Sequence, residues 1–376
     1  VIKVERPGLG DDTRLWGPPF LKDRQGVATG ESAYYLCANR NKKSVTVDFT
    51  QPAGQALVRE LALRCDVVVE NFKAGGLTQY GLDYATLSAL NPRLVYCSIT
   101  GFGQTGPYAH RAGYDFLIQG MGGLMSITGK PDGEPGGGPV KVGVALTDIL
   151  TGLYASTAIL AALQAREQTG RGQHIDLALL DVQVACLANQ GMNYLYSGQV
   201  PTRMGNAHPN TVPYQDFPTA DGHMILAIGN DGQFSRFCHA AGRPEWASDV
   251  RFTSNEARLA HRGELVALLR TLTVQRSTRD WIALLERHAV PCGPINTVAD
   301  VFADPQVQAR GMQMHMEHPQ AGSIPLVASP MRLSDTPVQY RISPPQLGQH
   351  TREVLGEVLG LSSGAIDELS EQGVLG

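Results

Sequence analysis

Residues 141–181 read KVGVALTDILTGLYASTAILAALQAREQTGRGQHIDLALLD. Asp148 is the only charged residue between Lys141 and Arg166 in this stretch, and it stands directly before a helical run with almost no polar side chains, residues 149–164. An ionised group in apolar surroundings is costly unless other groups satisfy it. The position of this carboxylate therefore calls for an explanation.

Two interpretations of Asp148 follow from the local pattern. Aspartate is a favoured N-cap, because its side chain accepts a bond from a free backbone N–H in the first helical turn. The alternative is a carboxylate nucleophile held at a helix N-terminus. The stretch by itself leaves both open.

The first half of the chain alternates between strand-like and helix-like segments. Strands are expected at residues 1–4, 44–48 (SVTVD), 66–69 (DVVV) and 94–100 (LVYCSIT), with a helix at 54–64. This rhythm predicts an α/β fold, a doubly wound, Rossmann-like sheet with helices on both faces. Ligands in such folds lie beyond the carboxyl ends of the strands, so the loops after residues 69, 100 and 146 are the places to search.

The second half predicts a smaller α+β domain and a return to the first. A helix is expected to continue from residue 181 to about 197, followed by a polar crossing segment, a strand at 224–228 and a tight turn at 291–294. Further helices are expected at 262–273, 278–289, 298–302, 350–359 and 364–372. The predicted organisation is a large domain at 1–198, a crossing linker at 199–218, a small domain at 219–311 and a return segment at 312–376.

Composition limits the classes of function. A formal net charge of −4 gives no general attraction to nucleic acid or anionic membranes. The best apolar run, 149–163, is too short for a membrane span. Six cysteines without CxxC or metal-type spacing indicate reduced thiols in a cytoplasmic compartment and no metal site. The chain opens directly on a strand-like alternation without Met, so we expect a preceding element to be missing.

Several groups lie where ligands are expected. Asn71, Phe72 and Lys73 follow the DVVV strand and offer an amide, an aromatic face and a cation, which suit a nucleotide. An exposed turn is the alternative. Tyr114 and Asp115 lie in a glycine-rich stretch after the LVYCSIT strand, where glycines permit either close ligand approach or turns.

Other candidates carry equally open alternatives. Gly229 follows an expected strand and precedes an expected helix. Its segment is either a lid over a site or a simple helix cap. The glycine-rich stretch 129–143 is expected to be a plain loop, since its spacing matches no P-loop. Five basic residues near the start of the chain could bind phosphates, although scattered surface cations are the commoner explanation. These residues are Arg6, Arg14, Arg40, Lys42 and Lys43. No Ser-His-Asp order, GxSxG, HExxH or GxGxxG pattern is present.

Taken in order, the motifs of the chain resemble one family. They are VIKVERPGLGDDTR, NRNKKSVTVDF, VVVENFKAGGLTQYGLDYATL, NPRLVYCSITGFGQTGPYAHRAGYDFLIQGMGG, ALTD before an apolar helix, TGRGQHIDLALLD, GNDGQF and VPCGPINTVADVFADPQV. The chain resembles class III (CaiB/BaiF-like) CoA-transferases over nearly its whole length, and most of all the succinyl-CoA:dicarboxylate branch. It departs at the start, where family members carry a further strand and helix with an active-site glutamine.

The resemblance implies a role for each matching residue. Asp148 takes the place of the nucleophile, which attacks an acyl-CoA thioester to form a mixed anhydride and then an aspartyl-CoA thioester. Asp115 takes the place of a supporting acid that is often Glu, Tyr114 that of a substrate-pocket tyrosine, and Gly229 opens a mobile loop over the intermediate. The implied CoA-binding residues are Arg6, Asn71, Phe72, Lys73 and Gly76. A basic CoA contact of some members is replaced here by Gln79.

The resemblance further implies an interlocked, ring-like homodimer that uses acyl-CoA and a small carboxylic acid as substrates, without a bound cofactor. An α-methylacyl-CoA racemase shares the fold but needs a histidine base where this chain has Tyr114. An inactive CoA-binding protein is the non-enzymatic alternative. Within the transferase interpretation, Arg203 and His208 could pair with the distal carboxylate of a dicarboxylate, or be ordinary loop residues.

Overall fold

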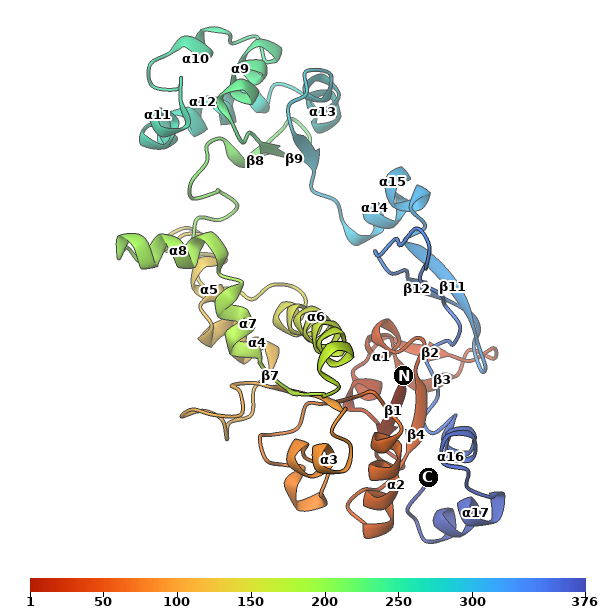
Figure 1. The fold of residues 1–376 in the computed structure, drawn as a ribbon. Coiled ribbons are helices and arrows are strands. Elements are labelled where there is room, and N and C mark those ends of the chain that lie inside the picture. Colours follow the sequence, from red (N-terminus) through yellow and green to blue (C-terminus); the bar gives the residue numbers. More distant parts are fainter. The chain divides into compact units, whose positions relative to one another are not determined.

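The computed structural model describes all residues 1–376, and the chain divides into two compact units, each discontinuous in sequence (Figure 1). The first unit consists of Val1–Asp115, Thr147–Val182 and Val301–Gly376, and the second of Phe116–Leu146 and Gln183–Asp300. These bounds differ from the predicted division at 198, 218 and 311. The main difference is that residues 116–146 belong with the second unit, where Gly205 N–H donates to Gly129 O at 2.9 Å.

Two parallel sheets form the centre of the first unit. One has the order β5 (Val67–Glu70), β6 (Val95–Thr100), β7 (His174–Ala178), and the other pairs β1 (Ile2–Glu5) with β4 (Lys43–Thr46). The four strands expected in the first half are therefore present, within one or two residues at their ends. β7 was not expected, and it becomes a strand because it pairs along β6 from Tyr96↔His174 to Thr100↔Ala178.

Helices and two antiparallel pairs complete the first unit. The pairs are β2 (Phe20–Lys22) with β3 (Ala28–Ser32) and β11 (Gln313–His318) with β12 (Gly322–Val327). The helical segments that lie wholly or partly in this unit are η1 (Asp12–Leu15), α1 (Ala33–Ala38), α2 (Pro52–Leu63), η2 (Thr78–Tyr80), α3 (Tyr84–Leu90), α6 (Leu146–Thr169), α7 (Leu179–Ala185), α14 (Val298–Ala303), α15 (Pro305–Ala309), α16 (Thr351–Leu359) and α17 (Ser363–Glu371).

The C-terminal residues pack into the same core as the first strands of the chain. Val45 of β4 and Leu57 of α2 share one buried cluster with Leu355 of α16 and Ile366 of α17. A second cluster joins α1 to the β11–β12 pair. Since apolar burial is the dominant stabilising contribution to folding, the return of residues 312–376 to the first unit completes its sheet region.

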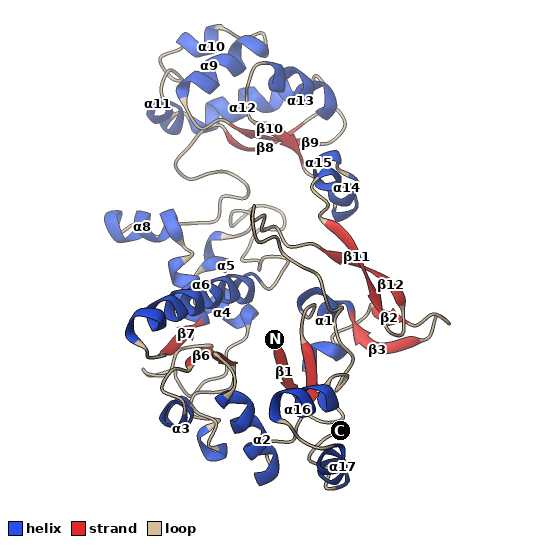
Figure 2. Cartoon of the chain, turned by 45° about the vertical axis from the view of Figure 1, so that its right-hand side comes forward, coloured by secondary structure: helices blue, strands red, loops and turns tan.

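The second unit is built on an antiparallel sheet of order β10 (Cys292–Pro294), β9 (His223–Ala227), β8 (Tyr214–Pro218). Figure 2 draws this sheet and the helices of the unit, and the core of the unit contains Trp281 and Phe237. Two expectations were wrong here: residues 214–218 are a strand rather than linker, and residues 291–294 pair with β9 rather than forming an isolated turn. Its helices are α4 (Asp115–Met121), α5 (Leu124–Ile127), α8 (Ala188–Ser197), α9 (Asp231–Ala240), α10 (Glu245–Ser248), α11 (Asn255–Ala260), α12 (Arg262–Thr273) and α13 (Thr278–Arg287).

Helix α6 is longer than its apolar run suggested. It begins at Leu146, so a helix and not the expected loop follows residue 146, and it ends at Thr169, before Gly170 at positive φ. By length and composition alone α6 could cross a membrane, and 22% of its most apolar window is buried in the protein. One such helix is weak evidence, since core helices of soluble proteins pass the same test of length and composition. The expected helix from 181 to 197 is broken into α7 and α8, because Ala188, the first residue of α8, has a φ of 47°.

Candidate active site

Asp148 is the third residue of α6 rather than its N-cap. The first turn is instead capped from another element, since Thr147 N–H donates to Asp115 Oδ1 at 2.8 Å. The Asp148 carboxylate itself makes no hydrogen bond or ion pair with another residue of the chain. The capping interpretation of Asp148 is therefore wrong, and the cap is Asp115.

The carboxyl group of Asp148 is unusually basic. The Asp148 side chain is exposed on one side, while protein atoms surround its carboxyl group on the others. This partial burial raises the pKa of the carboxyl group to about 6. The negative charge of Asp115 adds to the effect. A carboxylate with a raised pKa that is still mostly ionised at neutral pH is a better nucleophile than an ordinary one.

Asp115 reaches α6 because two glycines let the backbone cross at the carboxyl end of β6. A Cβ built on Gly101 would lie 2.5 Å from the Cα atom of Gly113, closer than real Cβ atoms approach. The loop that leaves β6 therefore returns at Gly113, directly before Tyr114 and Asp115. Tyr114 is 70% exposed, so its side chain is open to a ligand.

One residue beside Asp148 gave no signal in the sequence. Tyr34, in α1, has its pKa raised by burial and then by the charges of Asp148, Cys37 and Asp115, so it lies close to both carboxylates. The Trp16 ring meets the Tyr34 ring edge-on, at 5.1 Å between centroids. No spacing in the sequence relates these aromatic residues to Asp148, because only the tertiary fold brings α1 to α6.

The carboxyl ends of β1, β4 and β5 carry the second part of the site. Phe49 meets Phe72 at 5.9 Å and Tyr80 at 5.4 Å between ring centroids, and Phe72 is 46% exposed. Asn71 and Lys73 are exposed on either side of Phe72, with no hydrogen bond from their side chains. An aromatic surface flanked by an amide and a cation can take a purine ring and its phosphates.

Gly76 closes the turn after this strand. Its N–H donates to Lys73 O at 2.8 Å, and a Cβ there would lie 2.9 Å from the same oxygen. The glycine thus keeps the Lys73 turn tight. Its direct contact with CoA stays a prediction.

Of the five early basic residues, Arg6 is the one whose side chain forms no hydrogen bond or ion pair. Arg14 is buried against Glu5 and Glu31, and Lys43 pairs with Glu353. The remaining two donate hydrogen bonds: Arg40 to Val327 O and Lys42 to Asn39 Oδ1. Arg6 follows β1 directly and is exposed. Among them it is therefore the cation left for an anionic ligand.

Gly229 lies in the second unit, two residues before the start of α9. Its N–H donates to Gln233 Oε1 at 2.7 Å, and the neighbouring Asn230 caps α9 by accepting from Gln233 N–H at 2.9 Å. Asp231 accepts a bond from the buried Arg258 at 2.7 Å. The capping interpretation of this segment is confirmed, and the mobile-loop role stays a prediction.

The candidates for a distal carboxylate already have partners. Arg203 pairs with Asp132 and donates to Ser126 O at 3.2 Å. His208 Nδ1 accepts from Asn210 N–H at 3.1 Å, and its ring lies 5.2 Å from that of Tyr214. These contacts are those of ordinary loop residues, which was the alternative interpretation of both.

The comparisons with known proteins agree along nearly the whole chain. The model of CoA-transferase family III matches residues 1–351. A succinate–glutarate CoA-transferase of Agrobacterium fabrum is 54% identical over 95% of this chain and 88% of its own length. A succinyl-CoA:glutarate CoA-transferase of Mus musculus is 46% identical over 100% of this chain and 84% of its own. The crystal structure of a CAIB/BAIF family protein from Brucella suis superposes with a TM-score of 0.81 at 52% identity, covering 95% of this chain and 91% of that one.

Proposed function

Because the chain belongs to CoA-transferase family III, we propose that it transfers CoA from succinyl-CoA to glutarate or a dicarboxylate of similar length. The names of the two relatives above support this choice of substrates. The observation that carries the proposal is the Asp148 carboxylate, unpaired, made more basic by burial and by Asp115, and placed in the first turn of α6.

The proposed reaction begins with attack of an Asp148 oxygen on the thioester carbonyl of succinyl-CoA. The C–S bond breaks, which leaves a succinyl–aspartyl anhydride and CoA thiolate. The thiolate then attacks the aspartyl carbonyl, so that succinate departs and an aspartyl-CoA thioester remains. Glutarate attacks this thioester and expels the thiolate, which finally attacks the glutaryl carbonyl to give glutaryl-CoA and free Asp148.

No step of this cycle needs a proton transfer, since every nucleophile and leaving group is an anion. The demand on the protein is to position the thioester and to stabilise the tetrahedral oxyanions. The backbone N–H groups at the start of α6 favour negative charge there. A racemase, in contrast, needs a base, and the phenol of Tyr114 is a poor one near neutral pH.

The proposed CoA site uses the exposed groups at the strand ends. The aromatic surface of Phe72 and Phe49 takes the adenine ring, with Asn71 beside it. Arg6 and Lys73 attract the phosphates, and Tyr114 lines the acyl pocket. For Gly229, a role as a loop over the intermediate is supported by the resemblance alone.

The direct test is chemical trapping of Asp148. Protein incubated with succinyl-CoA and then treated with hydroxylamine or borohydride is expected to carry the modification on Asp148, found by peptide mass spectrometry. Asp148→Ala is expected to abolish exchange between labelled succinyl-CoA and glutarate while CoA still binds. Modification at another residue refutes the mechanism, and tight CoA binding without exchange to any acid supports the inactive-protein alternative.

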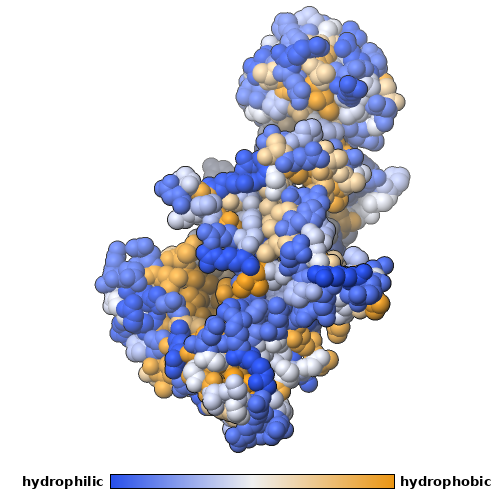
Figure 3. Space-filling model, turned by 90° about the vertical axis from the view of Figure 1, so that its right-hand side faces the viewer, coloured by the Kyte–Doolittle hydropathy of each residue, from blue (hydrophilic) through white to orange (hydrophobic).

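A homodimer is part of the proposal. The face of α6 turned away from its own unit carries large apolar side chains, Ile149, Leu153 and Leu160, which are 52%, 61% and 67% exposed. Its buried face carries small or polar ones, such as Thr151 and Ala155. Apolar groups also reach the surface elsewhere (Figure 3).

Such an exposed apolar helix face is the kind of surface that a subunit interface covers. The molar mass from light scattering after size exclusion is expected to be that of a dimer for the wild type. Leu153→Glu is expected to lower it to that of the single chain. An unchanged mass of the variant would contradict the placement of the interface on α6.

A further inference from the structure

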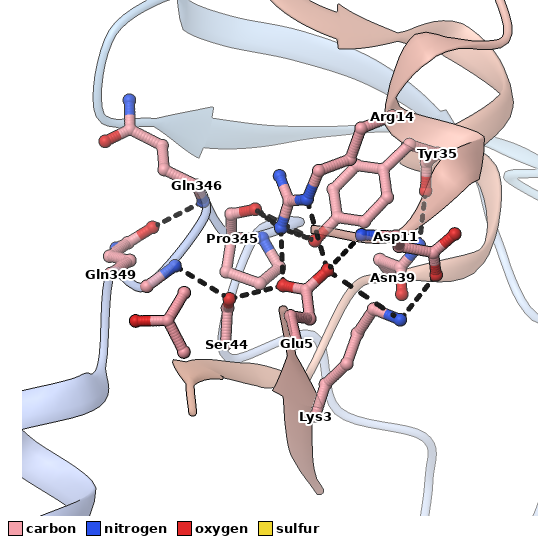
Figure 4. A network of polar contacts seen from close by, with 12 residues as sticks. Lys3, Glu5, Asp11, Arg14, Tyr35, Asn39, Ser44, Pro345, Gln346 and Gln349 are labelled. Atoms are coloured by element: carbon pink, nitrogen blue, oxygen red, sulfur yellow. Dashed lines mark hydrogen bonds and ion pairs between the residues drawn. The ribbon is translucent and has the colours of Figure 1, made fainter. Parts of the chain in front are cut away.

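Arg14 is almost fully buried, at 4% exposure, and it connects four segments of the first unit (Figure 4). Its Nε and Nη2 atoms donate to the two carboxylate oxygens of Glu5 at 3.2 and 2.8 Å. Nη1 donates to Glu31 Oε1 at 3.1 Å, and Nη2 also lies 2.7 Å from Tyr35 Oη and 3.2 Å from Pro345 O. The planar guanidinium supplies these donors in a fixed arrangement that no other side chain offers.

Glu5 holds both ends of the loop that carries Arg6. It is the last residue of β1, so Arg6 follows it directly. At the other end of the loop, Asp11 N–H donates to Glu5 Oε1 at 3.3 Å, and Gly10 N–H donates to Arg6 O at 2.9 Å. Glu5, which is 4% exposed, thus holds one end of the loop through its place in β1 and the other end through the bond from Asp11 to its carboxylate.

A buried carboxylate of this kind needs a counter-charge, and Arg14 provides the closer of two, at 2.8 Å. Lys3 Nζ lies 3.8 Å from Glu5 Oε1, but it pairs more closely with Asp11, at 2.5 Å. Ser44 adds a hydrogen bond to Glu5 Oε2, but a hydroxyl carries no charge. Without Arg14, Glu5 would lose its buried counter-charge, which is strongly unfavourable. The conformation of the Arg6 loop therefore depends on Arg14.

Arg14 also reaches the neighbourhood of Asp148. Its guanidinium lies 3.9 Å from the centre of the Tyr35 ring, and Tyr35 is the immediate neighbour of Tyr34 in α1. Two residues after Arg14 comes Trp16, whose ring contacts Tyr34. One buried side chain thus connects the Arg6 loop with the aromatic pair beside the nucleophile.

We propose that Arg14 is a positioning residue of the acyl-CoA site, which holds Arg6 ready for a CoA phosphate through Glu5. This inference rests on the proposed function, since it takes Arg6 as a CoA ligand. Arg14 itself touches no substrate. Its effect is preorganisation, because a loop already fixed in its binding conformation loses less conformational entropy when the ligand binds.

The test is a double-mutant cycle on the equilibrium binding of free CoA, measured by calorimetry with the full chain. Arg6→Ala and Arg14→Lys are each expected to raise the Kd by about tenfold, and the double variant by little more than either alone, because both remove the same interaction. Additive effects would show that Arg14 does not act through Arg6 and would overturn the inference. So would an unchanged Kd in either single variant.

A matched control separates positioning from general stability. Arg166 is also buried and also binds a carboxylate and a carbonyl, Asp66 Oδ1 at 2.9 Å and Arg93 O at 3.1 Å. It lies 18 residues after Asp148 in the same helix, about 27 Å away along the axis. Arg166→Lys is expected to lower the melting temperature as Arg14→Lys does, with a Kd for CoA within about twofold of the wild type. An equal rise in Kd for both variants would overturn the inference.

A second variant covers the case in which Arg14→Lys does not fold. Glu5→Gln then replaces it in the cycle, because it removes the charge that Arg14 neutralises and keeps the shape of the side chain. Binding of CoA is measured without turnover, so absence of CoA transfer in the wild type would refute the proposed function and leave the cycle readable.

Discussion

Replacing Asp115 by asparagine tests the electrostatic account of the nucleophile. The pKa of Asp148 is raised from 3.8 to about 6, by burial first and by the Asp115 charge second, so Asp115 accounts for less than half of the rise. The asparagine side chain would keep an oxygen for Thr147 N–H but lose the charge. The pKa of Asp148 in Asp115→Asn is therefore expected to lie between about 5 and 6.

The assay is the pH dependence of kcat/KM for succinyl-CoA, which reports the ionisation of the free enzyme. Asp148 attacks only when ionised, so activity falls as the pH drops through its pKa, near 6 in the wild type. At pH 5 a carboxyl group of pKa 6 is about 9% ionised and one of pKa 5 about 50%, so the activity relative to the plateau rises by up to about fivefold.

Asp115→Ala serves as the comparison, because it removes the charge and the helix cap together. In both variants the fall of kcat/KM at acidic pH is expected to shift to lower pH by the same amount. The alanine variant is also expected to lose about 1 kcal/mol in the free energy of unfolding, because it lacks the cap. An acid limb that stays in place, or moves to higher pH, in Asp115→Asn would refute the reasoning.

Three further outcomes are expected. Phe72→Ala should raise the Kd for CoA about five- to tenfold through loss of stacking on the adenine, while Leu90→Ala, an apolar control on α3 with similar exposure, leaves it unchanged in calorimetry. Asp148→Asn should raise the melting temperature at pH 7 but not below pH 3.8. Because the pKa of Asp148 is raised, the folded state binds this proton more tightly than the unfolded state, and folding stability falls as the pH rises from 3.8 to about 6. Asparagine carries no charge at any of these pH values and so avoids this loss. Gly101→Ala should lower kcat, because its methyl group would displace Gly113 and with it Asp115; a wild-type rate would contradict this.

Local pattern in the sequence predicted part of the fold. The strand at β5 and the helix at α2 follow from apolar runs and helical period. β7, in contrast, was missed, because HIDLA becomes a strand only through its pairing with β6. β10 was predicted as a turn for the same reason. Its glycine and proline give no strand signal, and it is a strand only because it pairs with β9.

The candidate site divides in the same way. Asp148 stood out as a lone charge before an apolar helix, and the glycine-rich stretch after the LVYCSIT strand indicated Tyr114 and Asp115, whose roles the resemblance supplied. The sequence could not show that Asp115 caps α6, since the cap joins residues 32 positions apart. Tyr34 was missed because its closeness to Asp148 depends on how α1 and α6 pack. Contacts distant in sequence carry no local signal.

The cap from Asp115 to Thr147 has a consequence for heat inactivation. The same carboxylate that closes the first turn of α6 also raises the basicity of Asp148, so opening of this turn removes both at once. Helix ends open at a lower free energy than the core of a domain. The temperature at which transfer activity is lost should therefore report the local opening of α6, and lie below the temperature at which the buried clusters of the first unit melt.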